Sequence, residues 1–301
     1  MTLPRALLVS LRPHQWTKNL VVLAALVFSK HLFDFDAAVR AAAAFVIFCA
    51  LSGATYLLND LADLSPDRVH PRKRQRPLAS GALRVPTARL ATAGLYVLGL
   101  GAALVLGPAF ALVAASYVAL NVAYSIGLKH VVILDVLAVS LGFVLRAVAG
   151  AVAIGVVFSD WLLVCTILLA LFLSLAKRRH EIVTLDTSAS EHRSILAEYS
   201  PYLLDQMISV VTASCVTAYA FYTMAPDTIE KYRTDRLALT IPFVLYGIFR
   251  YLYLVHRRDQ GGSPTDLLLA DRPLLVAVAL WAVAVGVIVY GAPGLPMPRR
   301  Q

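Results

Sequence analysis

Nine long apolar stretches dominate the sequence and predict a bundle of helices that cross a membrane. They cover residues 18–33, 37–58, 86–106, 109–127, 131–156, 160–176, 203–224, 237–255 and 273–292. Each is close to the roughly 20 residues that an α-helix needs to cross the hydrocarbon core of a bilayer. We therefore predict an all-α integral membrane protein with about nine transmembrane helices, in which residues 1–301 form a single transmembrane domain.

The composition supports this class and argues against two others. Hydrophobic residues make up 59% and charged residues 15% of the 301 positions, against about 45–50% and 25% in soluble domains. The three cysteines, Cys49, Cys165 and Cys215, lie inside the apolar stretches and have neither paired nor metal-ligand spacing. A secreted disulfide scaffold and a zinc module are therefore not expected.

The formal net charge of +9 comes from basic residues that are unevenly divided among the loops. If the N-terminus is cytoplasmic, 19 of the 27 Lys and Arg residues fall on the cytoplasmic side and 7 on the opposite side, which leaves Arg146 within the membrane. An excess of basic residues is the normal feature of cytoplasmic loops. We therefore predict a cytoplasmic-membrane protein whose N-terminus and long polar loops, 59–85 and 177–202, are cytoplasmic, and we expect no nucleic-acid partner.

The end of the second apolar stretch carries oxygen-bearing side chains at a regular spacing. Asn59, Asp63 and Asp67 recur every four residues, and Asp60 lies between them. A continuing helix would place the three on one face, although Pro66 disfavours helical backbone at the residue before it. Magnesium suits such a site because it takes one or two protein carboxylates and fills its other positions with water and substrate phosphate. A solvated acidic helix end is the alternative.

A basic loop follows this acidic segment directly. It contains Arg68, Arg72, Lys73, Arg74, Arg76 and Arg84, and it includes the string Arg76-Pro-Leu-Ala-Ser-Gly81. Carboxylates for magnesium and guanidinium groups for phosphate, in one loop, are typical of a site for a diphosphate held as its metal complex. Neither charge cluster alone is specific, because cytoplasmic loops are commonly basic.

The motif Asn-Asp-x-x-Asp-x-x-x-Asp at 59–67, followed by Arg76-Pro-Leu-Ala-Ser-Gly81, resembles the UbiA superfamily of intramembrane prenyltransferases. The resemblance covers essentially the whole chain. It implies helices around a central cavity, a polar cap on the cytoplasmic side formed by loops 59–85 and 177–202, and catalytic roles for Asp60, Asp63 and Asp67. It also implies a Mg²⁺ cofactor, with Asn59, Asp63 and Asp67 as ligands.

The chain departs from the family pattern after the sixth apolar stretch. Members usually carry a second acidic motif, Asp-x-x-x-Asp, whereas this position reads Lys177-Arg178-Arg179-His180-Glu181. Only Glu181 is available there to replace the second set of carboxylates. This departure argues against an aromatic prenyl acceptor, which remains the alternative.

Three segments resemble one branch of the superfamily, whose members join a polyprenyl phosphate such as decaprenyl phosphate to phosphoribosyl diphosphate (PRPP) in making arabinan precursors of cell walls. They are Leu11-Arg-Pro-His-Gln-Trp-Thr-Lys-Asn19, the segment from Tyr124 to Lys129, and Lys177-Arg-x-x-Glu181. Additional cations make sense in this branch, because its reaction must hold a diphosphate, a 5-phosphate and the lipid phosphate. The resemblance implies that the substrates contact Lys18, Asn59, Arg72, Arg74, Arg76, Tyr124, Lys129, Arg146, Lys177, Arg178 and Glu181.

Several of these residues have a simpler structural interpretation. Lys18, Tyr124 and Lys129 lie where interfacial anchors are common. Arg146 lies near the middle of its apolar stretch, where an ionisable residue faces an interior cavity by default. Its partner is either a phosphate or a group in another helix, because Asp135 lies eleven residues away, about 16 Å along a helix.

The predicted reaction is displacement at the anomeric carbon of ribose, in which magnesium and basic side chains stabilise the departing diphosphate while the lipid phosphate attacks. The acceptor is already an anion, so no strong general base is required. The motif at 59–67 serves a prenyl diphosphate equally well. A transporter is a rival from another class, since one intramembrane arginine also suits a permeation path. The length of the lipid and the oligomeric state stay open.

Overall fold

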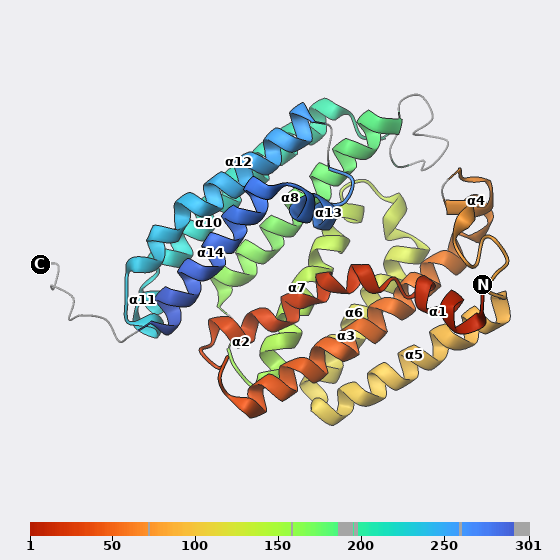
Figure 1. Ribbon diagram of the computed structural model, residues 1–301, viewed down its shortest axis with the longest axis horizontal. Coiled ribbons are helices and arrows are strands. Elements are labelled where there is room, and N and C mark those ends of the chain that lie inside the picture. The colour runs from red at the N-terminus through yellow and green to blue at the C-terminus, as the bar shows by residue number, and fades with distance from the viewer. Residues whose placement is uncertain (72, 158, 186–194, 196–197, 259–260, 292–301) are drawn as a thin grey trace, which may run out of the picture. The chain divides into compact units, whose positions relative to one another are not determined.

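The computed structural model describes all residues except 72, 158, 186–194, 196–197, 259–260 and 292–301, and it is nearly all helical over the described part (Figure 1). This confirms the predicted fold class. The chain forms two compact units, one of residues 1–158 with 190–198 and the other of residues 159–189 with 199–301. Each unit is described by itself below.

The first unit contains the N-terminal helices and both halves of the acidic and basic motif. Its elements are α1 (Leu3–Ser10), η1 (Pro13–Leu23), α2 (Ala24–Phe28), α3 (Phe35–Ala62), α4 (Leu64–Val69), η2 (Lys73–Gln75), α5 (Val85–Leu106), α6 (Pro108–Ile126), η3 (Leu128–His130) and α7 (Leu134–Ile154). The second unit consists of α8 (Asp160–Leu185), α10 (Pro201–Met224), α11 (Pro226–Tyr232), η6 (Arg236–Thr240), α12 (Ile241–Arg257), α13 (Pro264–Ala270) and α14 (Arg272–Tyr290).

Eight helices in the described residues are long and apolar enough to cross a membrane, and they coincide with eight of the nine predicted stretches. The protein is therefore a multi-pass membrane protein. Residues 18–33, predicted as the first span, instead lie in the 11-residue 3₁₀ helix η1 and the five-residue α2. Because a 3₁₀ helix rises about 2.0 Å per residue and an α-helix about 1.5 Å, the two together reach about 30 Å, close to the thickness of a hydrocarbon core.

Helix η1 packs closely against α7. A Cβ atom placed on Gly150 of α7 would lie 1.9 Å from the carbonyl oxygen of Val22 in η1. Only a glycine therefore lets the two helices approach so closely. Val22 is fully buried in the core of the first unit, together with Phe48 and Phe110.

Arg40, near the start of α3, has a structural role. Its Nε donates to the carbonyl of Ala153 at 2.6 Å and its Nη2 to that of Leu106 at 3.0 Å. These carbonyls lie at the C-terminal ends of α7 and α5, where the last turn lacks intrahelical donors. One cation near the start of α3 therefore caps two neighbouring helices.

The second unit is tied together by polar contacts between its helices. The indole of Trp281 in α14 donates to the hydroxyl of Tyr219 in α10 at 2.8 Å, and that hydroxyl lies 2.6 Å from Oγ1 of Thr240. Arg250 of α12 makes two hydrogen bonds to Asp271, whose carboxylate also caps the start of α14. The hydrogen bond from Arg250 lowers the pKa of Asp271.

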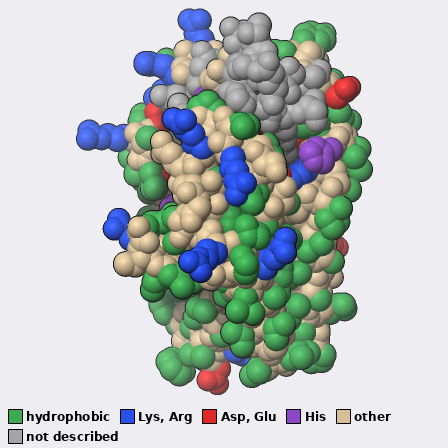
Figure 2. Space-filling model, turned by 90° about the vertical axis from the view of Figure 1, so that its right-hand side faces the viewer, with side chains coloured by type: hydrophobic (Ala, Val, Ile, Leu, Met, Phe, Trp, Pro, Cys, Tyr) green, Lys and Arg blue, Asp and Glu red, His purple; other side chains and the backbone are tan. Residues whose placement is uncertain are grey.

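Hydrophobic side chains cover much of the surface seen in Figure 2, and Lys and Arg side chains are concentrated in the upper part of that view. On α5 and α6, for example, Val97, Leu98, Val105 and Leu112 are each more than two-thirds exposed. Large exposed apolar side chains on soluble proteins are rarely so contiguous. Such a surface fits contact with lipid.

Candidate functional site

The acidic segment lies where α3 ends and α4 begins. Asp63 closes α3 with φ −97° and ψ 14°, so the helix axis breaks there, three residues before Pro66. The ladder of backbone hydrogen bonds nevertheless continues, because Asp63 N–H donates to Asn59 and Asp67 N–H donates to Asp63. Pro66 is accommodated in the first turn of α4, where its missing N–H is not needed.

Two buried carboxylates converge on Arg76. Asp60 and Asp67 are each 2% exposed. The Nη1 atom of Arg76 lies 3.1 Å from Oδ1 of Asp60 and 2.5 Å from Oδ2 of Asp67. Arg12 donates to the same Asp60 oxygen at 2.5 Å and lies over the ring of Tyr56, 4.9 Å from its centroid. The two carboxylates are therefore held by a shared guanidinium group.

The segment Arg76-Pro-Leu-Ala-Ser-Gly81 positions that guanidinium. Leu78 and Leu83 are almost fully buried in an apolar cluster with Leu57 of α3 and Ala6 of α1. The chain turns between them at Gly81, whose φ of +81° favours glycine. The apolar residues of this segment therefore anchor the loop, so that Arg76 faces the end of α3.

The other two polar residues of the acidic motif contact the end of α6 and the segment that follows it. Nζ of Lys129 in η3 donates to Oδ1 of Asp63 at 2.6 Å, and Oγ of Ser125 donates to the side-chain oxygen of Asn59. Lys73 approaches Asp67 at 3.9 Å. Each carboxylate of the motif is therefore paired with at least one basic side chain.

These pairings bear on the predicted metal ligands. Among the described residues, no group of three or more His, Cys, Asp or Glu side chains is arranged to hold a metal ion. Asn59, Asp63 and Asp67 each contact a different partner, namely Ser125, Lys129 and Arg76. Asp60 and Asp67 do converge, on the Nη1 atom of Arg76. Two converging carboxylates are a donor set that suits magnesium when water and phosphate complete its shell.

Arg146 is buried within the first unit, with 7% of its surface exposed. Its Nε donates to Oδ1 of Asn19 at 2.8 Å, its Nη2 to the hydroxyl of Tyr117 at 2.7 Å, and its Nη1 to the carbonyl of Gly142 at 2.9 Å. It also lies over the rings of Tyr117 and Phe143. The partners predicted to come from other helices are thus an amide in η1 and a phenol in α6.

The basic residues predicted after the sixth apolar stretch lie at the end of α8 in the second unit. Arg178 is 5% exposed and its Nη1 lies 2.5 Å from Oε2 of Glu181. Lys177 lies 3.7 Å from Oε1 of the same carboxylate. Glu181 is therefore held by two cations one turn away on its own helix.

For the remaining predicted residues, the structure gives the element and the degree of burial. Lys18 and Tyr124 are half-buried in η1 and α6, and Arg74 is exposed in η2. Arg72 lies outside the described residues. The substrate roles of all these residues stay predictions.

Sequence reasoning did not assign a site role to Arg12, Lys73, Ser125 or Tyr117, which the structure joins to the predicted residues. Arg12 lay inside the quoted segment 11–19, and Lys73 inside the basic loop, so both had a visible signal. Ser125 likewise lay inside the quoted segment from Tyr124 to Lys129. Tyr117 had no such signal, because a single hydroxyl in an apolar helix is usually bonded to its own backbone.

Comparison with solved structures supports the fold. A UbiA homologue from Archaeoglobus fulgidus, bound to GPP and Mg²⁺, superposes with a TM-score of 0.71 at 20% sequence identity, covering 95% of this chain and 99% of that one. At this identity the likeness concerns the fold alone. It agrees with the helical arrangement predicted from the family resemblance.

Comparison with curated sequences is more specific. The decaprenyl-phosphate phosphoribosyltransferase of Corynebacterium glutamicum is 34% identical over 293 residues, which cover 94% of this chain and 86% of the relative. The enzyme of the same name from Mycolicibacterium smegmatis is 34% identical over 94% of this chain and 92% of its own. The sequence profile of the UbiA prenyltransferase family matches residues 19–270. The predicted resemblance is thereby confirmed: this chain is an enzyme that belongs to the UbiA prenyltransferase family.

Proposed function

We propose that this enzyme transfers 5-phosphoribose from PRPP to a polyprenyl phosphate, such as decaprenyl phosphate, and releases diphosphate. The names of its relatives support the reaction class. The structural observation that supports it best is the excess of cations at the acidic motif. Three carboxylates are met there by four basic side chains: Asp60, Asp63 and Asp67 against Arg12, Lys73, Arg76 and Lys129.

This arrangement suits a polyanionic donor. A site that neutralises its own carboxylates and still carries net positive charge attracts a ligand with several phosphates. Arg76 and Arg74 of the basic loop then bind the diphosphate of PRPP. Lys129, beside Asp63, has the same chemical capacity from the end of α6.

Magnesium fits this site as the ion that accompanies the diphosphate, with Asp60 and Asp67 as its converging carboxylates and Asn59 and Asp63 as the further ligands predicted from the motif. When bound, a divalent ion stabilises the negative charge that develops on the departing diphosphate. The protein contributes by holding the two carboxylates buried and converging, and by supplying Arg76 for the phosphate oxygens.

The reaction balances without an acid or base from the protein. An oxygen of the acceptor phosphate forms a bond to the anomeric carbon while the bond from that carbon to diphosphate breaks, and diphosphate carries away the electron pair. Because the acceptor oxygen is already anionic at neutral pH, no proton has to be removed. The residues at the site act by binding and by electrostatic stabilisation.

Lys177 and Arg178 are proposed to bind further phosphate groups of the donor. They replace the carboxylates that the family usually carries after its sixth helix, and Glu181 holds both side chains in place. A ribosyl donor has a 5-phosphate that a prenyl donor lacks, so additional cations serve this reaction. We also propose that the segments 59–85 and 177–202 are cytoplasmic; residues 177–185, predicted as part of a loop, form the last turns of α8.

The test is turnover by detergent-purified enzyme with two donor and acceptor pairs. We expect diphosphate release from PRPP with polyprenyl phosphate, and none from a prenyl diphosphate with hydroxybenzoate. Asp67→Asn is expected to lower turnover by orders of magnitude, and Asp266→Asn, on α13 away from the acidic motif in sequence, serves as the matched control. Turnover of the prenyl donor alone would show that the aromatic prenyltransferase alternative is correct.

A further inference from the structure

The buried guanidinium group of Arg146 keeps donors for a further ligand. It has five N–H bonds, and three of them are used by Asn19, Tyr117 and the carbonyl of Gly142. The other two, one on Nη1 and one on Nη2, have no acceptor in the part of the chain that the structure describes. No carboxylate among the described residues pairs with Arg146 either. An arginine cannot lose its proton in a protein, so the side chain retains a full positive charge.

The hydroxyl group of Tyr117 adds one more donor beside the guanidinium. Its oxygen accepts from Nη2 of Arg146 at 2.7 Å, so its own proton is left to donate. The phenol ring is 2% exposed and packs against Phe48, with ring centroids 5.1 Å apart. The hydroxyl is therefore held in place by the packing of its ring.

Asn19 fixes the direction in which the guanidinium points. Its Nδ2 donates to Oγ of Ser52 at 3.1 Å and lies 3.3 Å from Sγ of Cys49, so its oxygen faces Nε of Arg146. The side chain is fully buried. An amide at this position orients the cation and leaves its charge intact.

This cluster lies deeper in the first unit than the acidic motif. Ser52 and Asp60 are eight positions apart on α3, which is about 12 Å along the helix. Tyr117 and Ser125, whose hydroxyl contacts the acidic motif, are likewise eight positions apart on α6. Both helices are candidate membrane spans that end near the acidic motif. Arg146 therefore offers a separate cationic point toward the interior of the membrane.

We propose that Tyr117 and Arg146 bind the phosphate of the polyprenyl acceptor, and that Asn19 positions the guanidinium for it. The inference rests on the proposed function. In an in-line displacement, the attacking oxygen approaches from the side opposite to the leaving group. With diphosphate at the acidic motif, that side is the membrane interior, where Arg146 lies. The acceptor reaches the site from there, because its hydrocarbon chain lies in the bilayer.

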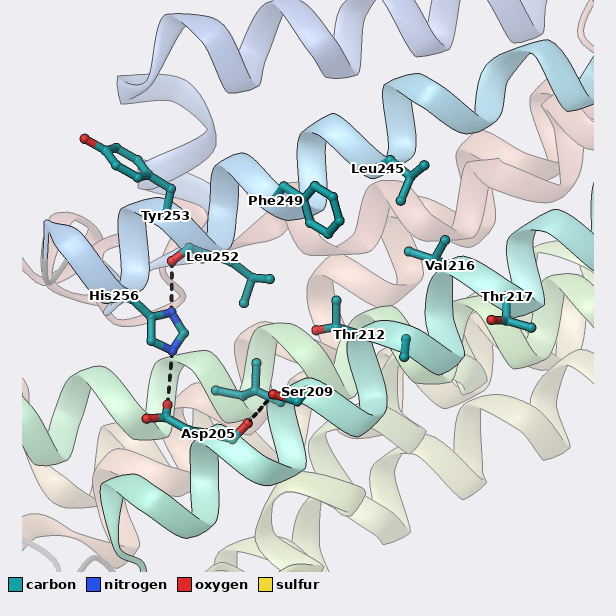
Figure 3. A pocket seen from close by; sticks show the side chains of 12 residues that line it. Asp205, Ser209, Thr212, Val216, Thr217, Leu245, Phe249, Leu252, Tyr253 and His256 are labelled. Carbon is teal, nitrogen blue, oxygen red and sulfur yellow. Dashed lines mark hydrogen bonds and ion pairs between the residues drawn. The ribbon is translucent and has the colours of Figure 1, made fainter.

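A groove in the second unit, between α10 and α12, is a poorer place for this phosphate (Figure 3). Asp205 lines it and its carboxylate contacts His256, as the dashed line in Figure 3 shows. A carboxylate repels an anionic head group. The charge of Arg146, by contrast, is permanent and is not offset by an ion pair within the described residues.

Asn19→Asp tests the charge of Arg146 with a nearly isosteric change. The carboxylate still accepts from Nε and also forms an ion pair with the guanidinium, so Tm in detergent should stay the same or rise. Binding of farnesyl phosphate to the full-length enzyme without PRPP, measured by microscale thermophoresis, should weaken about tenfold or more, since hydrogen bonds from a charged donor are lost. Farnesol, which lacks the phosphate, should bind equally well to the wild type and the variant.

Two further variants complete the test. Tyr117→Phe keeps the ring against Phe48 and removes only the hydroxyl, so it should raise the KM for polyprenyl phosphate severalfold and leave the KM for PRPP unchanged. Arg40→Gln is the matched control, because it removes an arginine of the same unit that also donates to backbone carbonyls. It should alter neither KM.

Three results would overturn the proposal. The first is equal affinity of the wild type and Asn19→Asp for farnesyl phosphate. The second is a rise in the KM for PRPP alone, and the third is weaker binding of ribose 5-phosphate with farnesyl phosphate binding retained. The last two would assign Arg146 to the 5-phosphate of the donor.

The binding assay also separates this inference from the proposed function. Weaker farnesyl phosphate binding in Asn19→Asp, in an enzyme that shows no ribosyl transfer, would support the phosphate site and refute the reaction. Ribosyl transfer with unaltered kinetics in both Asn19→Asp and Tyr117→Phe would support the reaction and refute the site.

Discussion

The guanidinium group of Arg76 contacts both Asp60 and Asp67 and therefore lies where a metal ion shared by the two carboxylates would bind. Its Nη1 atom lies 3.1 Å from one carboxylate and 2.5 Å from the other. A free divalent ion must therefore displace a guanidinium group that is already bound. We predict that Arg76→Gln raises the affinity of the enzyme for a divalent cation in the absence of PRPP.

The expected size of this effect follows from the charges. At a separation of about 4 Å and an effective dielectric constant of about 20, a guanidinium opposes each unit of metal charge by about 4 kcal/mol. The gain in metal affinity is smaller than this, because Arg12 still binds Asp60 and Lys73 still approaches Asp67 after Arg76 is replaced. These two cations continue to oppose the metal ion. A net gain of roughly 1.4–2.8 kcal/mol remains reasonable, which is about a tenfold to hundredfold gain in affinity.

Binding of Mn²⁺, followed by electron paramagnetic resonance in detergent, measures this directly. The matched control is Arg74→Gln, which removes the same charge from an exposed position of the same loop. Arg76→Gln should fold normally, because Leu78 and Leu83 still anchor the loop. Turnover should nevertheless fall in this variant, since the diphosphate loses a guanidinium partner.

The reasoning fails if the two variants bind Mn²⁺ equally well, because the gain would then reflect net charge and not the shared position of Arg76. It also fails if Arg76→Gln binds Mn²⁺ less tightly than the wild type. In that case the carboxylates need the guanidinium to stay converged. PRPP should increase Mn²⁺ affinity more in the wild type than in Arg76→Gln, since the donor draws Arg76 away from the carboxylates.

Three further predictions concern stability. Arg146→Leu should lower the free energy of unfolding by about 3 kcal/mol, because its buried hydrogen-bond partners lose a charged donor, and an unchanged Tm in scanning fluorimetry would contradict this. Gly150→Ala should cost more than about 2 kcal/mol, since its Cβ would lie 1.9 Å from the Val22 carbonyl, whereas Gly94→Ala, with open space around it, should be neutral or slightly stabilising. The pKa of Asp271 is lowered in the folded protein. Its ion pair with Arg250 therefore contributes stability that is fully present above the usual carboxyl pKa and is lost as the pH falls through the lowered pKa. Asp271→Asn should remove this pH dependence of Tm when thermal unfolding is measured across that range.

The helices that cross the membrane could be predicted from the sequence because length and hydropathy alone determine them. The stretch 237–255 corresponds to Arg236–Arg257, and 273–292 corresponds to Arg272–Tyr290. A membrane leaves a chain few alternatives, since every backbone polar group in the hydrocarbon must be bonded within its own helix. The boundaries of seven of these helices agree with the prediction within four residues, whereas the stretch predicted at 160–176 continues as a helix to Thr184.

The first span could not be predicted in this way. Residues 13–23 form a 3₁₀ helix in which Val22 packs closely against Gly150 of α7, a contact across more than a hundred positions that hydropathy does not reveal. Pro66 indicated a bend nearby, but the structure accommodates the proline inside α4 and turns earlier.

The candidate site shows the same division. The spacing within 59–67 and the adjacent basic loop indicated that carboxylates and cations lie close together. The hydrogen bond between Arg76 and Asp67, which are nine positions apart in the sequence, agrees with this. The pairing of Asp60 with Arg12 spans 48 positions, and that of Asp63 with Lys129 spans 66. Local patterns carry no information about such partners, so the particular pairs emerge only when the helices are packed.

Arg146 illustrates how far a physical argument from sequence reaches. The cost of a charge in the membrane required a partner from another helix or from a substrate, and Asn19 and Tyr117 meet the first possibility. Neither partner is a carboxylate, nor is the carbonyl of Gly142, so the hydrogen bonds orient the guanidinium without forming an ion pair. Aromatic rings on Tyr117 and Phe143 stabilise the cation further. A buried arginine whose bonds are satisfied and whose charge is kept suits the approach of an anion, which is why the phosphate role remains the sharper hypothesis for this residue.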